Sequence, residues 1–170
     1  MATSATSSTA QSKAASFAFD GLVNPLSLRT NWTEAATLAM VAQTPASKDA
    51  NLGRIVGHIL LSPVTIDGAP HIAVLGLAPM AVQPEVQRQG IGTALVAASL
   101  ERCRALGIQV VVVLGHPAYC PRFGFQPARR FGLSSDYDVP ADAFMALELT
   151  PGALDSTTGV AHYHAAFRSL

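Results

Sequence analysis

Charge is scarce in this 170-residue sequence, and neither sign dominates. Charged residues make up 13% of the chain, and 11 basic and 11 acidic residues leave no formal net charge. Nucleic-acid binding needs a basic excess or stripe. The only local basic cluster is Arg122, Arg129 and Arg130, which is too small for a duplex footprint. We therefore expect no nucleic-acid partner.

Cysteine and long apolar runs are scarce too. Cys103 and Cys120 are the only two cysteines, and they lack the CxxC spacing of a metal or redox motif. We expect free thiols in a reducing compartment, and hence a cytoplasmic protein. No uninterrupted apolar run approaches the ~20 residues that cross a bilayer, so no membrane partner is expected. His162 and His164 alternate on one predicted strand without a third ligand, so we expect no metal.

The first sixteen residues lack any structural pattern. This segment, 1–16, is rich in Ala, Ser and Thr, with one lysine and no acidic residue. It has neither the arginines of a transit peptide nor the apolar region of a secretory signal. We predict a disordered low-complexity tail there and a single domain over 17–170. A composition of 49% hydrophobic residues is ample for a buried core.

Apolar patterning in the rest of the chain predicts a mixed α/β sheet. Runs of apolar or β-branched residues predict strands at 38–42, 54–61, 71–83, 108–114, 143–149 and 160–167. Helical segments are predicted at 93–106, for one or two turns at 117–123, and at 17–30, where Pro25 interrupts the helix. The segment 62–70 is predicted to be a loop. Strand, helix and strand over 71–114 form a βαβ unit.

Two glycines lie between the strand 71–83 and the following helix. Gly90 and Gly92 carry no Cβ, so they can expose consecutive backbone N–H groups to a ligand. The first helical turn adds unpaired N–H donors and the positive end of the helix dipole, which suit a phosphate group. A GxG pair alone is weak support, because such pairs also occur in plain turns. The third glycine of a dinucleotide-binding loop is absent.

The context of this loop makes the interpretation more specific. The stretch 87–92 (QRQGIG) resembles the acyl-CoA-binding signature (Gln/Arg)-x-x-Gly-x-(Gly/Ala) of GNAT acetyltransferases. Two later stretches, 116–128 (HPAYCPRFGFQPA) and 144–154 (FMALELTPGAL), resemble the YhbS-like branch of predicted N-acetyltransferases. The resemblance covers 38–167 and has three motifs in the correct order. It identifies the chain as a GNAT-like α/β domain with a mixed central sheet and a βαβ acyl-CoA-binding core.

The resemblance implies an acetyl-CoA-dependent N-acetyltransferase. The acetyl group would pass to a primary amine by direct attack in a ternary complex, and the acceptor would be a small molecule or a protein. The bulged strand before the loop would bind the pantetheine arm, and the loop would bind the pyrophosphate. Gly76 and Pro79 fit that interrupted strand. The implied cofactor-binding residues are Met80, Ala81, Val82, Gln87, Arg88, Gln89, Gly90, Ile91, Gly92 and Thr93.

The catalytic groups are less regular. Family members often supply the proton for the departing thiolate from a tyrosine, and that position falls here on Cys120, one residue after Tyr119. Three interpretations stay open: Tyr119 donates the proton, Cys120 donates it, or the thiolate leaves without help. We favour Tyr119. His116, which follows a predicted strand directly, is the best candidate for a base or a ligand contact.

The beginning of the chain departs from the family pattern. GNAT domains open with a strand and two helices before the hairpin, whereas 17–30 supplies at most the last of these. We therefore expect the N-terminal strand and helix to be missing or shortened. We expect an uncovered sheet edge as a result, which the partner in a homodimer would cover. These departures favour an alternative function, a non-catalytic acyl-CoA-binding or degenerate module that acts through a partner.

Overall fold

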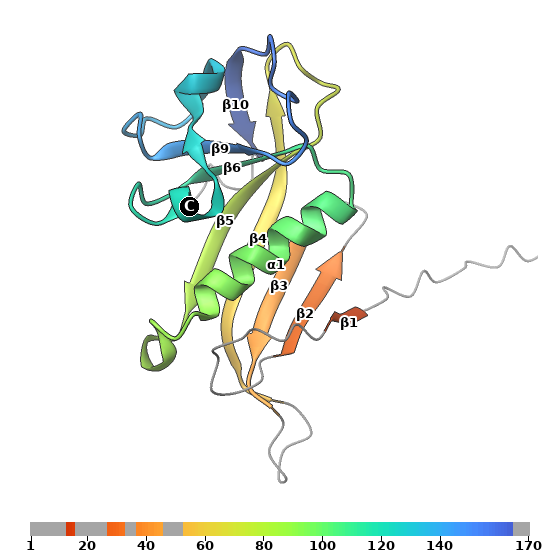
Figure 1. The fold of residues 1–170 in the computed structure, drawn as a ribbon, viewed down its shortest axis with the longest axis vertical. Helices are drawn as coiled ribbons and strands as arrows, with labels where there is room; N and C mark the ends of the chain where they lie inside the picture. The colour runs from red at the N-terminus through yellow and green to blue at the C-terminus, as the bar shows by residue number, and fades with distance from the viewer. Residues whose placement is uncertain (1–12, 16–26, 33–36, 46–52, 165–170) are drawn as a thin grey trace, which may run out of the picture.

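The computed structural model describes residues 13–15, 27–32, 37–45 and 53–164 (Figure 1). Most of the predicted tail and most of the predicted helix at 17–30 lie outside these described residues. The strands are β1 Lys13–Ala15, β2 Ser27–Trp32, β3 Leu38–Gln43, β4 Ile55–Ile66, β5 Val74–Val82, β6 Val110–Leu114, β7 Gln126–Pro127, β8 Leu133–Ser135, β9 Phe144–Glu148 and β10 Gly159–Tyr163. The helices are α1 Ile91–Ala105 and the short 3-10 helices η1 Pro84–Val86, η2 Cys120–Phe123 and η3 Ala128–Phe131.

The strands form one mixed sheet in the order β1-β2-β3-β4-β5-β6-β9-β7. Neighbours on this path are antiparallel except β5 and β6, which are parallel and are joined by α1. This arrangement confirms the predicted βαβ unit. β4 is long enough to take two partners on one edge: β3 pairs with its first part and β10 with its last part. β8 pairs in parallel with β10.

The sheet is covered on both faces, and β6 shows this most clearly. Val111 and Val113 belong to the core cluster that includes α1, whereas Val110 and Val112 belong to a second cluster with β8 and β10. Alternate residues of a strand point to opposite faces, so the β-branched run is buried on both sides. The prediction of a strand covered on both faces at 108–114 is therefore confirmed.

Helix α1 crosses the face formed by β3, β4 and β5 (Figure 1). Its N-terminal end lies close to β4 at Gly57. A Cβ at Gly57 would lie 3.1 Å from a methyl group of Leu95 and 3.3 Å from one of Ile91. The glycine therefore lets the first turns of α1 approach the sheet closely, which fixes the loop before the helix beside β5.

The two parallel strands diverge near the middle of β5. Pairing with β6 runs from Val74 to Leu77 and then stops, while β5 continues along β4 to Val82. The register between β4 and β5 also shifts, between Ile59 and Leu61. Pro79 lies just beyond the last pair with β6, where its missing N–H costs no ladder hydrogen bond. The predicted interruption is confirmed at Pro79, whereas Gly76 is paired with both β4 and β6 and does not interrupt the strand.

The predicted loop at 62–70 is wrong over its first half, because β4 continues to Ile66. The proline that suggested a loop, Pro63, lies where β4 changes partners. Pairing with β3 ends at Leu61 and pairing with β10 begins at Val64. A proline is tolerated at this break, since no ladder partner faces it on that edge.

The predicted helix at 17–30 is also wrong where the structure describes it. Ser27–Trp32 is strand β2, which pairs with β3 along its whole length, and β1 pairs with β2 in turn. Pairing with a long neighbouring strand overrides a weak local pattern. The edge of β3 is therefore covered by β2 of the same chain. The uncovered sheet edge that suggested a homodimer is absent at β3. A strand, β2, therefore does precede β3, and among the described residues no α-helix precedes α1.

Candidate functional site

The site begins where β5 leaves β6, because backbone groups are left without a strand neighbour there. Gln83 donates its N–H to the carbonyl of Val56 on β4 at 2.9 Å, so its backbone groups face β4. Successive residues of an antiparallel strand face opposite edges, and Val82 and Met80 therefore direct their backbone N–H and C=O groups to the edge of β5 away from β4. On that edge β6 has already ended its pairing at Leu77. Apart from the Val82 carbonyl, which accepts a hydrogen bond from Gln87, the strand therefore offers unpaired N–H and C=O groups to an extended ligand, which is what an amide-bearing pantetheine arm requires.

The loop after β5 has the backbone of an anion site. Gly90, the residue before α1, has a φ of 84°, and Arg88 has a φ of 61°, in the left-handed region that residues with a side chain avoid. No side chain caps the helix. The N–H groups at its start, from Gly90 to Thr93, therefore stay available, together with the positive end of the helix dipole. Such a terminus binds phosphate.

A side-chain hydrogen bond ties the loop to the strand. The amide Nε2 of Gln87 donates to the carbonyl oxygen of Val82 at 3.0 Å. This bond satisfies one of the carbonyl groups that β6 leaves unpaired. It also holds the start of the loop against β5. Gln87, the first residue of the recognised motif, therefore has a structural role at this position.

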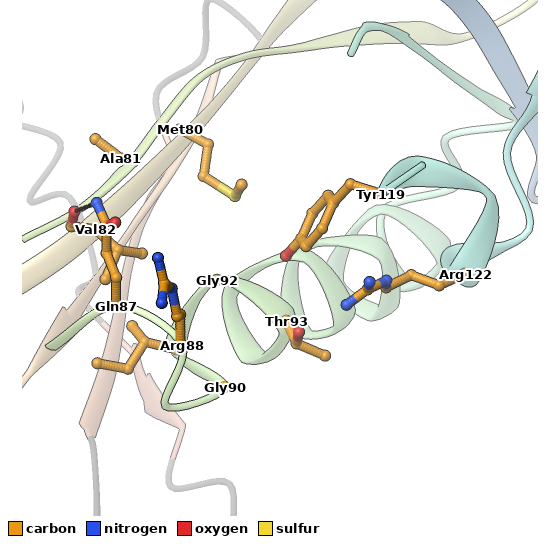
Figure 2. A pocket seen from close by; sticks show the side chains of 11 residues that line it. Met80, Ala81, Val82, Gln87, Arg88, Gly90, Gly92, Thr93, Tyr119 and Arg122 are labelled. Atoms are coloured by element: carbon orange, nitrogen blue, oxygen red, sulfur yellow. Dashed lines mark hydrogen bonds between the residues drawn. The ribbon is translucent and has the colours of Figure 1, made fainter. Parts of the chain in front are cut away.

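The strand edge and the loop together form a cleft of about 630 Å³ (Figure 2). Its walls come from β5, the loop, the first turn of α1 and η2. The cleft is lined by Met80, Ala81, Val82, Gln87, Arg88, Gly90, Ile91, Gly92, Thr93, Tyr119 and Arg122. Every predicted cofactor-binding residue except Gln89 lines it. Gln89 is exposed and lies outside this lining.

Arg122 was not predicted as a site residue, although it lies in the basic cluster and in the motif 116–128. Figure 2 shows its side chain directed from η2 toward the first turn of α1. Its guanidinium carbon lies 4.7 Å from the ring centroid of Tyr119, a cation–π distance. Arg88 lines the opposite side, and no acidic residue lines the cleft. The cleft is therefore electropositive in a chain without net charge, as polyphosphate binding requires.

Tyr119 extends across the cleft toward the helix. A Cβ at Gly92 would lie 3.2 Å from its hydroxyl oxygen, so the hydroxyl lies directly over the first turn of α1 (Figure 2). The ring of Phe123 packs against it edge-to-face at 5.3 Å. Arg122 and Phe123 thus hold the tyrosine ring from η2. The side chain is half-buried, with its polar end in the cleft.

Cys120 points away from that cleft. Its thiol packs behind the backbone of Gly115, where a Cβ would lie only 2.5 Å from the Sγ atom, and its side chain belongs to the core. Burial raises the pKa of the Cys120 thiol, although the backbone of His116 partly opposes this. A thiol that stays protonated is a poor nucleophile.

His116 lies at the rim of a second, smaller space beside the cleft. Its Nδ1 accepts a hydrogen bond from the N–H of Ala118 at 3.2 Å. The neutral imidazole therefore carries its proton on Nε2 and can donate from there. The second space has a volume of about 260 Å³, and Met80 and Tyr119 line both spaces. We call the larger space the cleft and the smaller one the apolar cavity.

Other ligand types find less support in the described part of the chain. No group of three or more His, Cys, Asp or Glu side chains is placed there to hold a metal ion. Both cysteines are buried free thiols. No described helix is both long and apolar enough to span a bilayer.

Comparisons with known proteins agree with this geometry. The sequence model of the acetyltransferase (GNAT) family matches residues 12–125. The uncharacterized N-acetyltransferase YhbS of Escherichia coli K12 is 34% identical over 115 residues, which are 68% of this chain and 68% of that protein. The uncharacterized N-acetyltransferase YjhQ of the same organism is 41% identical over 92 residues, which are 53% and 51% of the two chains.

Two solved structures are similar in fold and in sequence. YhbS from Escherichia coli in complex with CoA has a TM-score of 0.70 and 32% identity, covering 77% of this chain and 69% of that one. A GNAT family acetyltransferase from Brucella melitensis in complex with acetyl-CoA has a TM-score of 0.58 and 33% identity, covering 76% and 68%. An open strand edge, an uncapped helix start and two arginines suit the same ligand. The chain belongs to the GNAT family and is an acetyl-CoA-dependent acetyltransferase.

Proposed function

We propose that this protein transfers the acetyl group of acetyl-CoA to a primary amine by direct attack in a ternary complex, with Tyr119 as the proton donor to the departing thiolate. The placement of the Tyr119 hydroxyl carries the proposal. It lies over Gly92 inside the cleft, beside the open edge of β5 at Met80. The acceptor is the primary amine of a small molecule or of a protein.

The proposed ligand path follows the cleft. The backbone N–H groups from Gly90 to Thr93, with Arg88 and Arg122, bind the phosphates, and the open edge at Val82 and Met80 binds the pantetheine amides. This path brings the sulfur end of the ligand to Met80 and Tyr119. When bound, acetyl-CoA supplies an activated thioester whose carbonyl carbon an amine can attack. Positioning of the two reactants is then the main contribution of the protein.

Proton balance follows from this arrangement. The neutral amine attacks the thioester carbonyl, the carbon–sulfur bond breaks, and the hydroxyl of Tyr119 gives its proton to the leaving thiolate. The proton lost by the attacking nitrogen passes through water and restores the phenol. No carboxylate lines the cleft or the apolar cavity, so no acidic side chain of these linings accepts that proton.

His116 is proposed to contact the acceptor. With its proton on Nε2, the imidazole is not proposed to act as the base. Its Nδ1 is occupied by the N–H of Ala118, and its Nε2 therefore donates. Cys120 is proposed to pack in the core. Its buried thiol and raised pKa oppose an acyl-enzyme, which would need a reactive thiolate.

The missing base favours a second candidate, a non-catalytic acyl-CoA-binding module that acts through a partner. The two candidates are separated by isothermal titration with acetyl-CoA, followed by a thiol-release assay over a panel of primary amines and lysine peptides. Binding together with turnover on at least one amine supports the enzyme. Binding without turnover on any amine supports the module, and absence of binding contradicts both.

The cellular compartment and the oligomeric state are part of the proposal. We propose a cytoplasmic protein, because its two thiols are free and buried. For the solution state we propose a homodimer, which size-exclusion chromatography with light scattering tests directly. A mass near twice 17.7 kDa supports the dimer, and a mass near 17.7 kDa contradicts it.

A further inference from the structure

The apolar cavity lies where β5 and β6 diverge, beyond the inner end of the cleft. Leu77 and Pro79 line it from β5, Val113 and Leu114 line it from β6, and Phe125 also lines it. Its volume is about 260 Å³. The divergence of the strands creates this space, because no strand pairing fills it after Leu77.

The cavity adjoins the proposed position of the reacting thioester. Met80 and Tyr119 line both the cleft and the cavity, so the two spaces meet at these residues. The proposed function, on which this inference rests, brings the coenzyme sulfur to that junction. The acyl carbon is bonded to the sulfur, and the rest of the acyl chain therefore extends into the cavity.

The cavity is much larger than an acetyl group needs. Its volume of about 260 Å³ exceeds several times the ~30 Å³ share of one water molecule, which is close to the size of a methyl group. An acetyl group would leave most of the space unused. Unfilled apolar space offers no contacts to its lining, so a longer chain gains dispersion and hydrophobic energy there.

The chemistry of the lining selects the kind of chain. No aspartate, glutamate, lysine or arginine lines the cavity. Its polar side-chain atoms belong to Tyr119, Cys120 and the exposed His116 at the rim. A carboxylate at the end of a dicarboxylic acyl group would be desolvated without a cationic partner, which is costly. An unbranched alkyl chain has no such cost.

We propose that the apolar cavity is an acyl-chain subsite, and that the enzyme binds thioesters of straight-chain acyl groups of about four to six carbons more tightly than acetyl-CoA. The subsite is formed by the middle of β5 and the end of β6. The acyl donor range of this protein therefore extends beyond acetyl-CoA to short- and medium-chain acyl-CoA thioesters.

Titration calorimetry without acceptor tests this proposal, with CoA, acetyl-CoA, butyryl-CoA, hexanoyl-CoA and succinyl-CoA as probes. Each buried methylene contributes ~0.8 kcal/mol, which is about fourfold in affinity. Butyryl-CoA is expected to bind up to ~15-fold more tightly than acetyl-CoA, and more tightly than succinyl-CoA of equal chain length. Butyryl-CoA that binds no better than acetyl-CoA would overturn the proposal. Failure of CoA and of every thioester to bind would instead contradict the proposed function itself.

A pair of substitutions locates the chain. Leu114→Phe adds bulk at the end of β6 and is expected to abolish the gain with chain length while CoA still binds. Leu60→Phe is the matched control, because Leu60 is another half-buried leucine that lines neither space. The gain should survive in this control. A gain that survives equally in Leu114→Phe would place the chain elsewhere and overturn the subsite.

The same cavity has one rival occupant, an apolar side chain of the acceptor. Thiol release from acetyl-CoA is therefore measured with amines of increasing apolar size. A higher kcat/KM for larger amines, combined with no preference for longer acyl-CoA, would assign the cavity to the acceptor and overturn the acyl-chain subsite. An affinity that rises with acyl length, together with a kcat/KM that does not change with amine size, supports the acyl-chain subsite.

Discussion

The hydroxyl of Tyr119 lies over Gly92, so close that a Cβ at position 92 would lie 3.2 Å from it. The tyrosine directly precedes η2 and the glycine belongs to the first turn of α1, 27 positions earlier in sequence. This contact brings the proposed proton donor to the uncapped start of the helix, where the glycine loop ends.

Gly92→Ala tests that contact. The added methyl group would touch the tyrosine hydroxyl and approach Val82 and Met80 at 3.8 and 3.9 Å, which narrows the cleft. We expect acetyl-CoA affinity to stay within about twofold, because the acyl-CoA-binding motif accepts alanine at this position and the hydroxyl can move a few tenths of an ångström. The displaced hydroxyl should lower kcat by about tenfold, because proton donation depends on its position. Stability should not fall, since alanine favours a helix. A kcat equal to that of the wild type would contradict a proton donor placed over Gly92.

Tyr119→Phe and Cys120→Ala separate the two candidate proton donors. Removal of the tyrosine hydroxyl should lower kcat by about 10²-fold or more and leave acetyl-CoA affinity within about twofold. Cys120→Ala should lower stability by about 1 kcal/mol, because a buried Sγ atom is lost, and leave kcat near the wild-type value. The reverse pattern, with kcat lost only in Cys120→Ala, would assign the donor role to the cysteine.

The two arginines of the cleft should contribute to binding through charge. Arg88→Ala and Arg122→Ala are each expected to weaken CoA binding by about fivefold at low salt, and by less in 0.5 M salt, because these are exposed charges. Arg130→Ala is the control, since Arg130 is exposed on η3 and lines neither space. Equal effects of all three substitutions would show only a general loss of positive charge.

Stability should fall in alkali because of a buried thiol. Burial raises the pKa of Cys103 from 9.0 to about 12. Between these values the unfolded thiol is ionised and the folded thiol is not, so the unfolded state binds fewer protons and the free energy of unfolding decreases with pH. Burial also raises the pKa of Tyr163, which extends the decrease to higher pH.

Urea unfolding with a reducing agent at pH 8 and pH 10 measures this linkage. The wild type should lose about 1 kcal/mol more of its unfolding free energy over this interval than Cys103→Ala does. Cys120 and Tyr163 remain in both proteins, so their contributions cancel. Parallel losses in the two proteins would contradict a buried, protonated Cys103.

The anion-site geometry of the glycine loop was predictable because its requirements lie in consecutive residues. A strand, two glycines and a helix start place N–H groups together by local geometry alone, and the structure forms the cleft around Gly90 and Gly92. Arg122 was not predictable as a lining residue, because its approach to α1 depends on how η2 packs after β6. Counting along the motif also could not decide whether Tyr119 or Cys120 faces the cleft. The turn at 116–120 and the packing of the thiol behind Gly115 decide it.

In the sheet too, strands set by local sequence were predictable, and strands set by pairing with distant segments were not. The run of valines in β6 predicted a strand covered on both faces, because burial on two sides leaves a direct pattern in the sequence. β2 had no such pattern and was predicted as helix, since its strand conformation comes from pairing with β3. The full length of β4 was not predicted, because Pro63 is typical of a loop. A proline is acceptable there only because β4 pairs with β3 before it and with β10 after it.

Acetyl-CoA titration of a matched pair of glycine variants tests the central claim, which is that the loop before α1 holds the coenzyme. Gly90→Glu places bulk and negative charge where the pyrophosphate is expected. Gly107→Glu is the control, because Gly107 follows the other end of α1 with a similar φ of 75° against 84° and open space around it. Circular dichroism confirms that both variants fold. We predict wild-type affinity in Gly107→Glu and no measurable binding in Gly90→Glu. Unchanged affinity in a folded Gly90→Glu variant would contradict the account.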